Sequence, residues 1–204
     1  MIKTVIFDLG GVLVRTENKL PRQKLAEKHG MSYQELSDLV YRTKSANLAT
    51  IGKVSAGDHQ QTILRNLNLP LDSFSSFEDE FWGGDRLDSH LVEFIQSLRG
   101  EYRTVLLSNA WDNLRKLLEG LWKIDGVFDE IFISAEMGFA KPDPAIYKVV
   151  IDSLGQDPAE LIFVDDFVEN IKAARESGLN AVHFRNRDQA LADLADYLDL
   201  DLEI

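Results

Sequence analysis

Hydrophobic positions follow two different patterns along the chain, and the pattern changes after residue 14. Residues 5–7 form a short apolar run of β-branched and aromatic side chains, which is typical of a strand buried on both faces. Asp8 follows this run directly, and Gly10 and Gly11 come next. Paired glycines after a strand allow a tight turn or the close approach of a ligand. The pattern therefore predicts a first strand that ends in a carboxylate beside a glycine loop.

From residue 15 to residue 88 the apolar positions recur with the three-and-four spacing of helices. Ser32 and Glu35 form a capping box, which marks the start of one of these helices. Amphipathic helices are predicted at residues 21–29, 32–44, 55–67 and 73–82. Because no segment of this region has a strand pattern, we expect an all-helical unit inserted after the first strand.

Beyond residue 88, predicted helices and strands alternate to the end of the chain. Asp143 and Pro144 mark one helix start, since Asp is a good N-cap and Pro a good first helical residue. Strands are predicted at residues 104–107, 131–133, 161–164 and 181–184, with helices at 89–99, 113–121, 144–154, 168–178 and 188–198. This alternation predicts a parallel sheet wrapped by helices.

The composition narrows the classes of site and partner. The chain has 204 residues, no cysteine, four histidines and a net charge of −12. Without cysteine it has no disulfide and no thiol nucleophile, so any metal must be held by oxygen or imidazole ligands. The acidic balance argues against nucleic acid, which is bound by Lys and Arg. No apolar run approaches the roughly 20 residues that span a bilayer, and we expect a cytoplasmic protein with no membrane partner.

Polar groups follow three of the predicted strands at the points where the strands end. Parallel strands with right-handed crossovers direct their carboxyl ends to one edge of the sheet, so these groups can converge there. They are Asp8, Ser108 with Asn109, and Asp165 with Asp166, joined by Lys141 just before a helix start. Each residue alone has a plainer interpretation as a turn, a cap or a surface position. Together, three acids with one Lys and one hydroxyl suit a hard cation and a phosphoryl group.

Four short motifs in this order resemble those of the haloacid dehalogenase superfamily. They are DLGGV from Asp8, LLSN ending at Asn109, GFAKP containing Lys141, and VDDFVEN with Asp165, Asp166 and Asn170. The resemblance covers essentially the whole chain, because the helical insertion lies where that family carries its cap. It implies an α/β fold with a Rossmann-like, five-stranded parallel sheet of order 3-2-1-4-5. Residues 1–14 and 89–204 would form the catalytic core, and residues 15–88 the helical cap.

The resemblance also implies roles in catalysis and phosphate binding. Asp8 would be the nucleophile that forms an aspartyl-phosphate, with Lys141 and Ser108 as the other catalytic residues. Ser108, Lys141, the amide of Asn109 and the loop at Gly11 would hold the phosphoryl oxygens.

A second set of roles concerns the metal. By the same resemblance, Mg²⁺ would be held by Asp8, by the backbone carbonyl of Gly10 and by Asp166. Asp165 and Asn170 would orient metal-bound water or Lys141.

Gly10 departs from the family's phosphatase pattern, which usually carries a second Asp two positions after the nucleophile as general acid and base. Dehalogenases of the family place an aromatic residue near there, and phosphonate-cleaving relatives a small one. Dehalogenation needs no metal, however, and Asp165 with Asp166 would then be a repulsive pair beside the nucleophile Asp8. We therefore favour a Mg²⁺-dependent phosphoester hydrolase that acts on a small phosphorylated metabolite such as a sugar phosphate.

Three other functions stay open at this point. The first is a catalytically weakened phosphate-binding or regulatory module, in which Gly10 marks lost chemistry, although a mere binder has no need for the nucleophile Asp8. The second is a metal-independent 2-haloacid dehalogenase, and the third a phosphonate-cleaving enzyme. The oligomeric state is open between monomer and homodimer.

Overall fold

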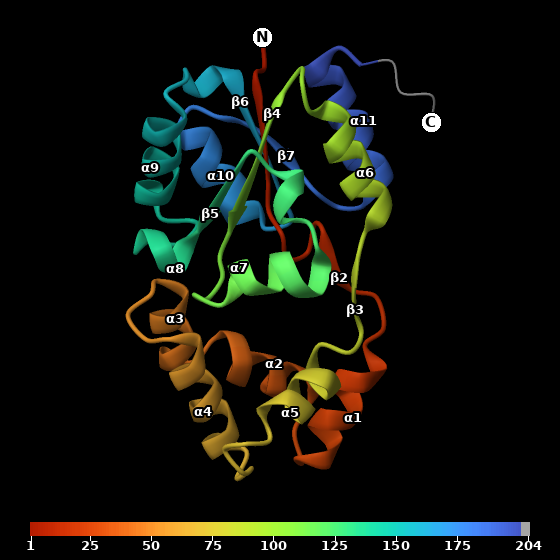
Figure 1. Ribbon diagram of the computed structural model, residues 1–204, viewed down its shortest axis with the longest axis vertical. Coiled ribbons are helices and arrows are strands. Elements are labelled where there is room, and N and C mark those ends of the chain that lie inside the picture. The colour runs from red at the N-terminus through yellow and green to blue at the C-terminus, as the bar shows by residue number, and fades with distance from the viewer. Residues whose placement is uncertain (201–204) are drawn as a thin grey trace.

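A five-stranded parallel sheet forms the centre of the upper part of the molecule (Figure 1). The structure is a computed structural model that describes residues 1–200, and its sheet has the order β5-β4-β1-β6-β7. The strands are β1 (Thr4–Phe7), β4 (Arg103–Ser108), β5 (Glu130–Ile133), β6 (Leu161–Asp165) and β7 (Asn180–His183). Counted along the chain they stand in the order 3-2-1-4-5, and every neighbouring pair is parallel. The predicted Rossmann-like sheet is confirmed.

Helices cover both faces of this sheet, as the apolar run in β1 requires. Val5 and Phe7 belong to one apolar cluster and Ile6 to another, because successive side chains of a strand point to opposite faces. Two helices pack on the first face, namely α6 (Ser89–Leu98) and α11 (Arg187–Leu198). Two pack on the second, namely α9 (Pro144–Leu154) and α10 (Val168–Glu176).

Shorter helical elements complete this part of the chain. They are α7 (Leu114–Leu117) with a π-helical turn at Leu118–Trp122, α8 (Ser134–Met137), and 3₁₀ turns at Asp125–Val127 and Pro158–Glu160. The helix predicted at residues 113–121 corresponds to α7 and its π-helical turn. Within residues 1–200, no helix is long and apolar enough to cross a membrane.

The inserted region forms a separate group of helices below the sheet (Figure 1). They are α1 (Leu20–Lys28), α2 (Tyr33–Tyr41), α3 (Lys44–Thr50), α4 (Ala56–Asn66) and α5 (Phe74–Phe81). The apolar faces of α1, α2, α4 and α5 share a cluster that includes Leu36, Ile63 and Phe81. The capping box at Ser32 is confirmed. The helix predicted at 32–44 ends earlier, because the Thr43 side chain accepts a hydrogen bond from the Ala46 amide and caps a new helix, α3.

The expectation of a strand-free insertion is wrong at its two ends. The chain enters the insertion through β2 (Val14–Thr16) and leaves it through β3 (Asp85–Leu87), and the two strands pair antiparallel. Each strand has three residues, which is too short to show a period of two in the sequence. The division into residues 1–14 with 89–204 and residues 15–88 stays a prediction, and residues 201–204 of that predicted core lie outside the described part.

A buried carboxylate holds the place where β3 returns to the sheet. Asp88 caps α6 by accepting a hydrogen bond from the Leu91 amide, and it accepts two more from Arg15 at 2.7 Å and Arg187 at 3.2 Å. Burial by itself would raise the pKa of Asp88, but the hydrogen bonds from Arg15, Leu91 and Arg187 lower it. The carboxylate therefore stays charged and ties β2, α6 and α11 together.

Candidate active site

The carboxyl ends of three neighbouring strands meet at one level of the sheet. Phe7 of β1 pairs with Leu106 of β4 and with Val164 of β6. The next residue of each strand is therefore Asp8, Leu107 or Asp165, and the Asp8 amide donates to the Val164 carbonyl at 2.9 Å. The convergence predicted from the strand ends is thus built into the register of the sheet.

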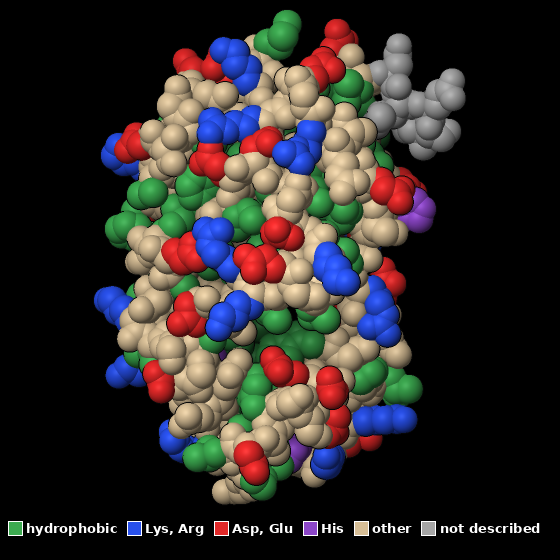
Figure 2. All heavy atoms as spheres, in the orientation of Figure 1, with side chains coloured by type: hydrophobic (Ala, Val, Ile, Leu, Met, Phe, Trp, Pro, Cys, Tyr) green, Lys and Arg blue, Asp and Glu red, His purple; other side chains and the backbone are tan. Residues whose placement is uncertain are grey.

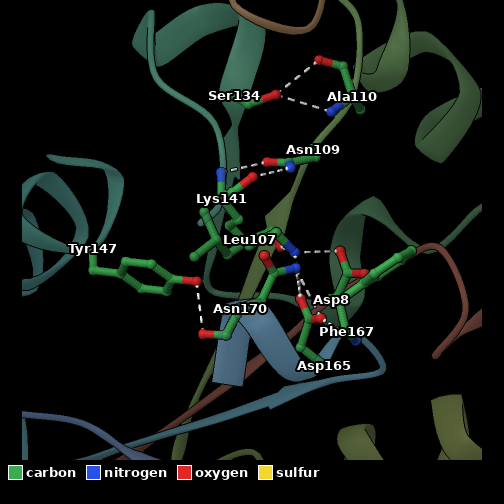
Figure 3. Close-up of polar contacts among 10 residues, drawn as sticks. All are labelled: Asp8, Leu107, Asn109, Ala110, Ser134, Lys141, Tyr147, Asp165, Phe167 and Asn170. Carbon is green, nitrogen blue, oxygen red and sulfur yellow. Dashed lines mark hydrogen bonds and ion pairs between the residues drawn. The ribbon is translucent and has the colours of Figure 1, made fainter. Parts of the chain in front are cut away.

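Lys141 lies at the centre of this level and uses its whole ammonium group (Figure 3). Its Nζ is 2.7 Å from Oδ1 of Asp8 and 2.8 Å from Oδ2 of Asp165, and it donates to the Leu107 carbonyl at 3.0 Å. An ammonium group has three hydrogens, so each has a partner. Burial alone would lower the pKa of Lys141, but the carboxylates of Asp8 and Asp165 outweigh it and raise the pKa.

The Asn109 side chain holds the backbone of Lys141 in place. Its Nδ2 donates to the Lys141 carbonyl and its Oδ1 accepts from the Lys141 amide, both at 2.8 Å. The phosphate-binding role expected of the Asn109 backbone amide stays a prediction beside this clamp by the side chain. The next residue of the loop, Ala110, is held at both its amide and its carbonyl by the buried hydroxyl of Ser134 (Figure 3).

Asp165 holds Lys141 and is held in turn by the start of α10. Its Oδ1 accepts from the Phe167 amide at 2.8 Å and from Asn170 Nδ2 at 2.9 Å, while its Oδ2 faces Lys141. The Asn170 carbonyl accepts a hydrogen bond from the hydroxyl of Tyr147 on α9. Both carboxylate oxygens of Asp165 thus have partners, and its role in orienting Lys141 or metal-bound water stays a prediction.

Asp166 has an oxygen that the protein leaves without a partner. Within residues 1–200, its Oδ1 is buried and accepts no hydrogen bond. The carboxylate lies directly against the backbone of Gly11, where a Cβ would stand 2.2 Å from Oδ2. Gly11 also has φ +83°, which glycine adopts readily. A side chain at this position would strain the backbone and would force the Asp166 carboxylate to move.

The site concentrates negative charge around a single Lys. Carboxylate oxygens of Asp8, Asp165 and Asp166 lie within 4.8 Å of one another. Burial, with added repulsion from Asp165, raises the pKa of Asp8 to about 7 although Lys141 opposes the shift. Burial and Asp165 likewise raise the pKa of Asp166 to about 6. A buried oxygen without a donor and carboxyls that resist ionisation fit a divalent cation with oxygen ligands.

Ser108 and Gly10 complete the predicted set. Ser108 ends β4 and is buried, and its hydroxyl makes no hydrogen bond to any other residue in the range 1–200, so it is available to a ligand. Gly10 is exposed, has no positive φ and would place a Cβ in open space, with no atom within 4 Å. The structure thus brings Asp8, Lys141 and Asp165 into direct contact and sets Asp166 beside Gly11.

Two kinds of supporting group were not predicted from the sequence: those that bond to the backbone around the site, and those that contact the insertion. The clamp of Asn109 on Lys141 and the hydroxyls of Ser134 and Tyr147 have no motif of their own. Trp111, on the loop after β4, contacts the insertion, and the neighbouring Asp112 accepts a hydrogen bond from the Ala56 amide at 2.9 Å. An aromatic residue in a loop of polar residues was the one available signal.

Known proteins match most of this chain in sequence. The family model of haloacid dehalogenase-like hydrolases matches residues 2–178. A sesquiterpene phosphatase of Aspergillus oryzae is 28% identical over 183 residues, covering 89% of each chain. A D-ribitol-5-phosphate phosphatase of Bacteroides thetaiotaomicron is 25% identical over 196 residues, covering 91% of this chain and 93% of that one. An (S)-2-haloacid dehalogenase of Burkholderia cepacia is also 25% identical, over 198 residues, covering 91% and 84%.

Some relatives are much longer. Bifunctional epoxide hydrolase 2 of Rattus norvegicus is 34% identical over 97 residues, which is 46% of this chain and 18% of that protein. The match therefore spans less than a fifth of this longer relative.

Solved structures share the fold over nearly the whole chain. A HAD-like hydrolase from Porphyromonas gingivalis has a TM-score of 0.81 at 23% identity and covers 98% of this chain and 100% of its own. A HAD-family enzyme from Bacteroides thetaiotaomicron, solved with magnesium and inorganic phosphate, has a TM-score of 0.74 at 24% identity and covers 90% and 94%. With the family model matching residues 2–178, this chain is a hydrolase of the haloacid dehalogenase-like family.

Proposed function

We propose that this hydrolase cleaves phosphate monoesters of small metabolites, with Mg²⁺, through an aspartyl-phosphate at Asp8. The observation that carries the proposal is the buried Asp8 carboxylate, held at 2.7 Å by Lys141, next to an Asp166 oxygen without a partner among the described residues. This arrangement pairs a positioned nucleophile with a free anionic ligand for a cation.

The reaction would proceed in two displacements. In the first, the Asp8 carboxylate attacks phosphorus, the bond from phosphorus to the ester oxygen breaks, and the departing alcohol takes up a proton from water. In the second, water attacks phosphorus, the bond to Asp8 breaks, and inorganic phosphate and the free carboxylate result. Lys141 offsets negative charge on the nucleophile and on the transferring group, and the free Ser108 hydroxyl donates to a phosphoryl oxygen.

Mg²⁺ would be held by Asp8, Asp166 and the Gly10 carbonyl. When bound it would neutralise the carboxylates and polarise the phosphoryl group. Asp165 is a weaker candidate ligand, because both of its oxygens already accept hydrogen bonds.

The rival functions account for less of the site. A metal-independent dehalogenase would leave the buried oxygen of Asp166 uncompensated and would keep the pKa of Asp8 raised, which disfavours the ionised nucleophile. A non-catalytic module has no need for Asp8 and Lys141 in contact. The full-length likeness to the D-ribitol-5-phosphate phosphatase supports a phosphate ester as substrate.

The test is phosphate release from a panel of phosphate esters with Mg²⁺ and with EDTA. We expect activity with Mg²⁺, none with EDTA, and a return to background in Asp8→Asn, which keeps the shape of the side chain but removes its charge. Asp152→Asn is the matched control, because Asp152 lies on the exposed surface of α9, where it pairs with Lys148. Undiminished turnover in EDTA, or release of halide from 2-haloacids without metal, would favour the dehalogenase instead.

A further inference from the structure

Three aromatic rings meet where the insertion faces the loop after β4. Trp111 comes from that loop, and its ring centroid is 6.5 Å from Tyr41 at the end of α2 and 6.4 Å from Trp82 just after α5. Tyr41 and Trp82 are themselves 6.4 Å apart. We call these three residues the aromatic wall.

Residues of the insertion hold the aromatic wall in place. The Trp82 indole N–H donates to the Tyr41 hydroxyl at 2.6 Å, and the ring of Phe81 packs against both. The ring centroids of Trp111 and His59 are 4.7 Å apart in an edge-to-face arrangement, and His59 is buried with hydrogen-bond partners on both ring nitrogens. The rings therefore form a preset surface, and little side-chain entropy is lost when a ligand contacts it.

The aromatic wall is nevertheless open to solvent. Tyr41 is 45% exposed although it lies against three other aromatic rings, and Trp82 and Trp111 are half-buried. Figure 2 shows the surface hollowed between the two parts of the molecule, with hydrophobic side chains on the floor of the hollow below α7. An aromatic surface that stays accessible to solvent is available for contact with an apolar group of a ligand.

The aromatic wall also lies within reach of the phosphoryl site. Trp111 is three residues beyond Ser108, so their Cα atoms are at most about 11 Å apart. The intervening residues are fixed by the bonds of Asn109 to Lys141 and of Ala110 to Ser134. The loop therefore holds the Trp111 ring close to a phosphate ester bound at Ser108 and Lys141.

We propose that the aromatic wall selects phosphate esters whose leaving group carries an aromatic ring, with Tyr41, Trp82 and Trp111 as specificity-determining residues. The inference rests on the proposed function and narrows its substrate class. Stacked or edge-to-face ring pairs contribute beyond the area they bury, and the Tyr41 hydroxyl and the Trp82 indole N–H are already bonded to each other. An aromatic alcohol also leaves as a stabilised anion, which suits a site with Gly10 in place of a proton donor.

The experiment compares 2-naphthyl with phenyl phosphate, whose leaving groups have similar acidity but differ by one ring. We expect the wild type to favour 2-naphthyl phosphate about tenfold in kcat/KM, from the added ring contact. Trp111→Leu and Tyr41→Leu should bring this ratio close to one. Tyr197→Leu is the matched control, because Tyr197 is a similarly exposed aromatic residue on α11. The proposal would be overturned if both Trp111→Leu and Tyr41→Leu kept the wild-type ratio, or if the wild type turned over glycerol phosphate faster than either aryl ester.

A binding measurement separates failure of this inference from failure of the proposed function. Calorimetric titration with 2-naphthylmethylphosphonate and methylphosphonate needs no turnover. Tighter binding of the naphthyl compound that is lost in Trp111→Leu supports the aromatic wall even if no ester is hydrolysed. Equal binding of the two phosphonates contradicts it even if phosphate esters are hydrolysed with Mg²⁺.

Discussion

Replacing Gly10 by Asp puts a carboxyl two positions after the proposed nucleophile, at a position where the native glycine offers no proton. The fold should accept it, because Gly10 is exposed, has no positive φ and would place a Cβ with nothing within 4 Å. Loss of a glycine restricts the unfolded chain and stabilises by up to about 1 kcal/mol. Repulsion from Asp8 and Asp166 opposes this gain, so we expect a folded variant of near wild-type stability.

The expected effect on the rate depends on the leaving group. A positioned general acid contributes about 10²- to 10⁴-fold, or roughly 3–5 kcal/mol of the barrier. Alkyl and sugar alcohols need that proton on departure, whereas nitrophenolate does not. We expect Gly10→Asp to raise kcat/KM for alkyl phosphates by about a hundredfold or more and to leave nitrophenyl phosphate nearly unchanged.

The assay is steady-state phosphate release from alkyl and nitrophenyl esters by wild type, Gly10→Asp and Gly10→Asn. Gly10→Asn is the matched control, since it has the same shape without an acidic proton and should leave the alkyl-to-aryl ratio at the wild-type value. Circular dichroism and thermal melting establish that the variants are folded. A folded Gly10→Asp enzyme with unchanged alkyl turnover, beside a wild type already fast on alkyl esters, would show that a proton donor lies elsewhere.

Two further predictions concern the cation and its loop. Gly11→Ala should lose roughly 1–3 kcal/mol of unfolding free energy in urea denaturation, because its Cβ would stand 2.2 Å from Asp166 at a positive φ. Gly10→Ala is the control and should keep the wild-type stability. Equal losses in the two variants would contradict the packing of Asp166 on Gly11. The pKa values of Asp8 and Asp166 are raised to about 7 and about 6, so the metal-free fold keeps protons that the unfolded chain releases near pH 4. The stability that these bound protons contribute is present at low pH and is lost as pH rises through 6 to 7. Mg²⁺ competes with these protons, so it should bind about 20-fold more weakly at pH 6 than at pH 8. The rise in melting temperature that Mg²⁺ causes should therefore be larger at pH 8. An equal rise at both pH values would show that Asp8 and Asp166 do not bind the metal.

The sheet and the placement of Asp8 beside Asp165 could be predicted from the sequence, because both depend on local, strongly patterned segments. β1 is apolar at each of residues 5–7, and Asp8 follows without a spacer, so strand and carboxylate are fixed together by one short run. Parallel connectivity then carries Asp165 to the same level, since the register of β1 with β6 leaves little freedom.

What the sequence did not reveal depends on contacts between distant segments. β2 and β3 have three residues each and exist as strands only because they pair with each other. The clamp of Asn109 on the Lys141 backbone satisfies main-chain groups, which carry no side-chain signal. The contact of Trp111 with Tyr41 depends on how the insertion sits over the sheet, and amphipathic spacing gives the direction of each helix face only relative to its own axis.

Chemical trapping of the acyl phosphate tests the central claim most directly. The protein is mixed with nitrophenyl phosphate and Mg²⁺, quenched in acid during turnover, reduced with borohydride and analysed by peptide mass spectrometry. An aspartyl-phosphate is reduced to homoserine, and without an acid at position 10 to activate water the intermediate should accumulate. We predict homoserine at position 8, in a yield that EDTA abolishes and that Asp152→Asn leaves unchanged. Turnover with Asp8 unmodified, or modification at another residue, would contradict the assignment of Asp8 as the nucleophile.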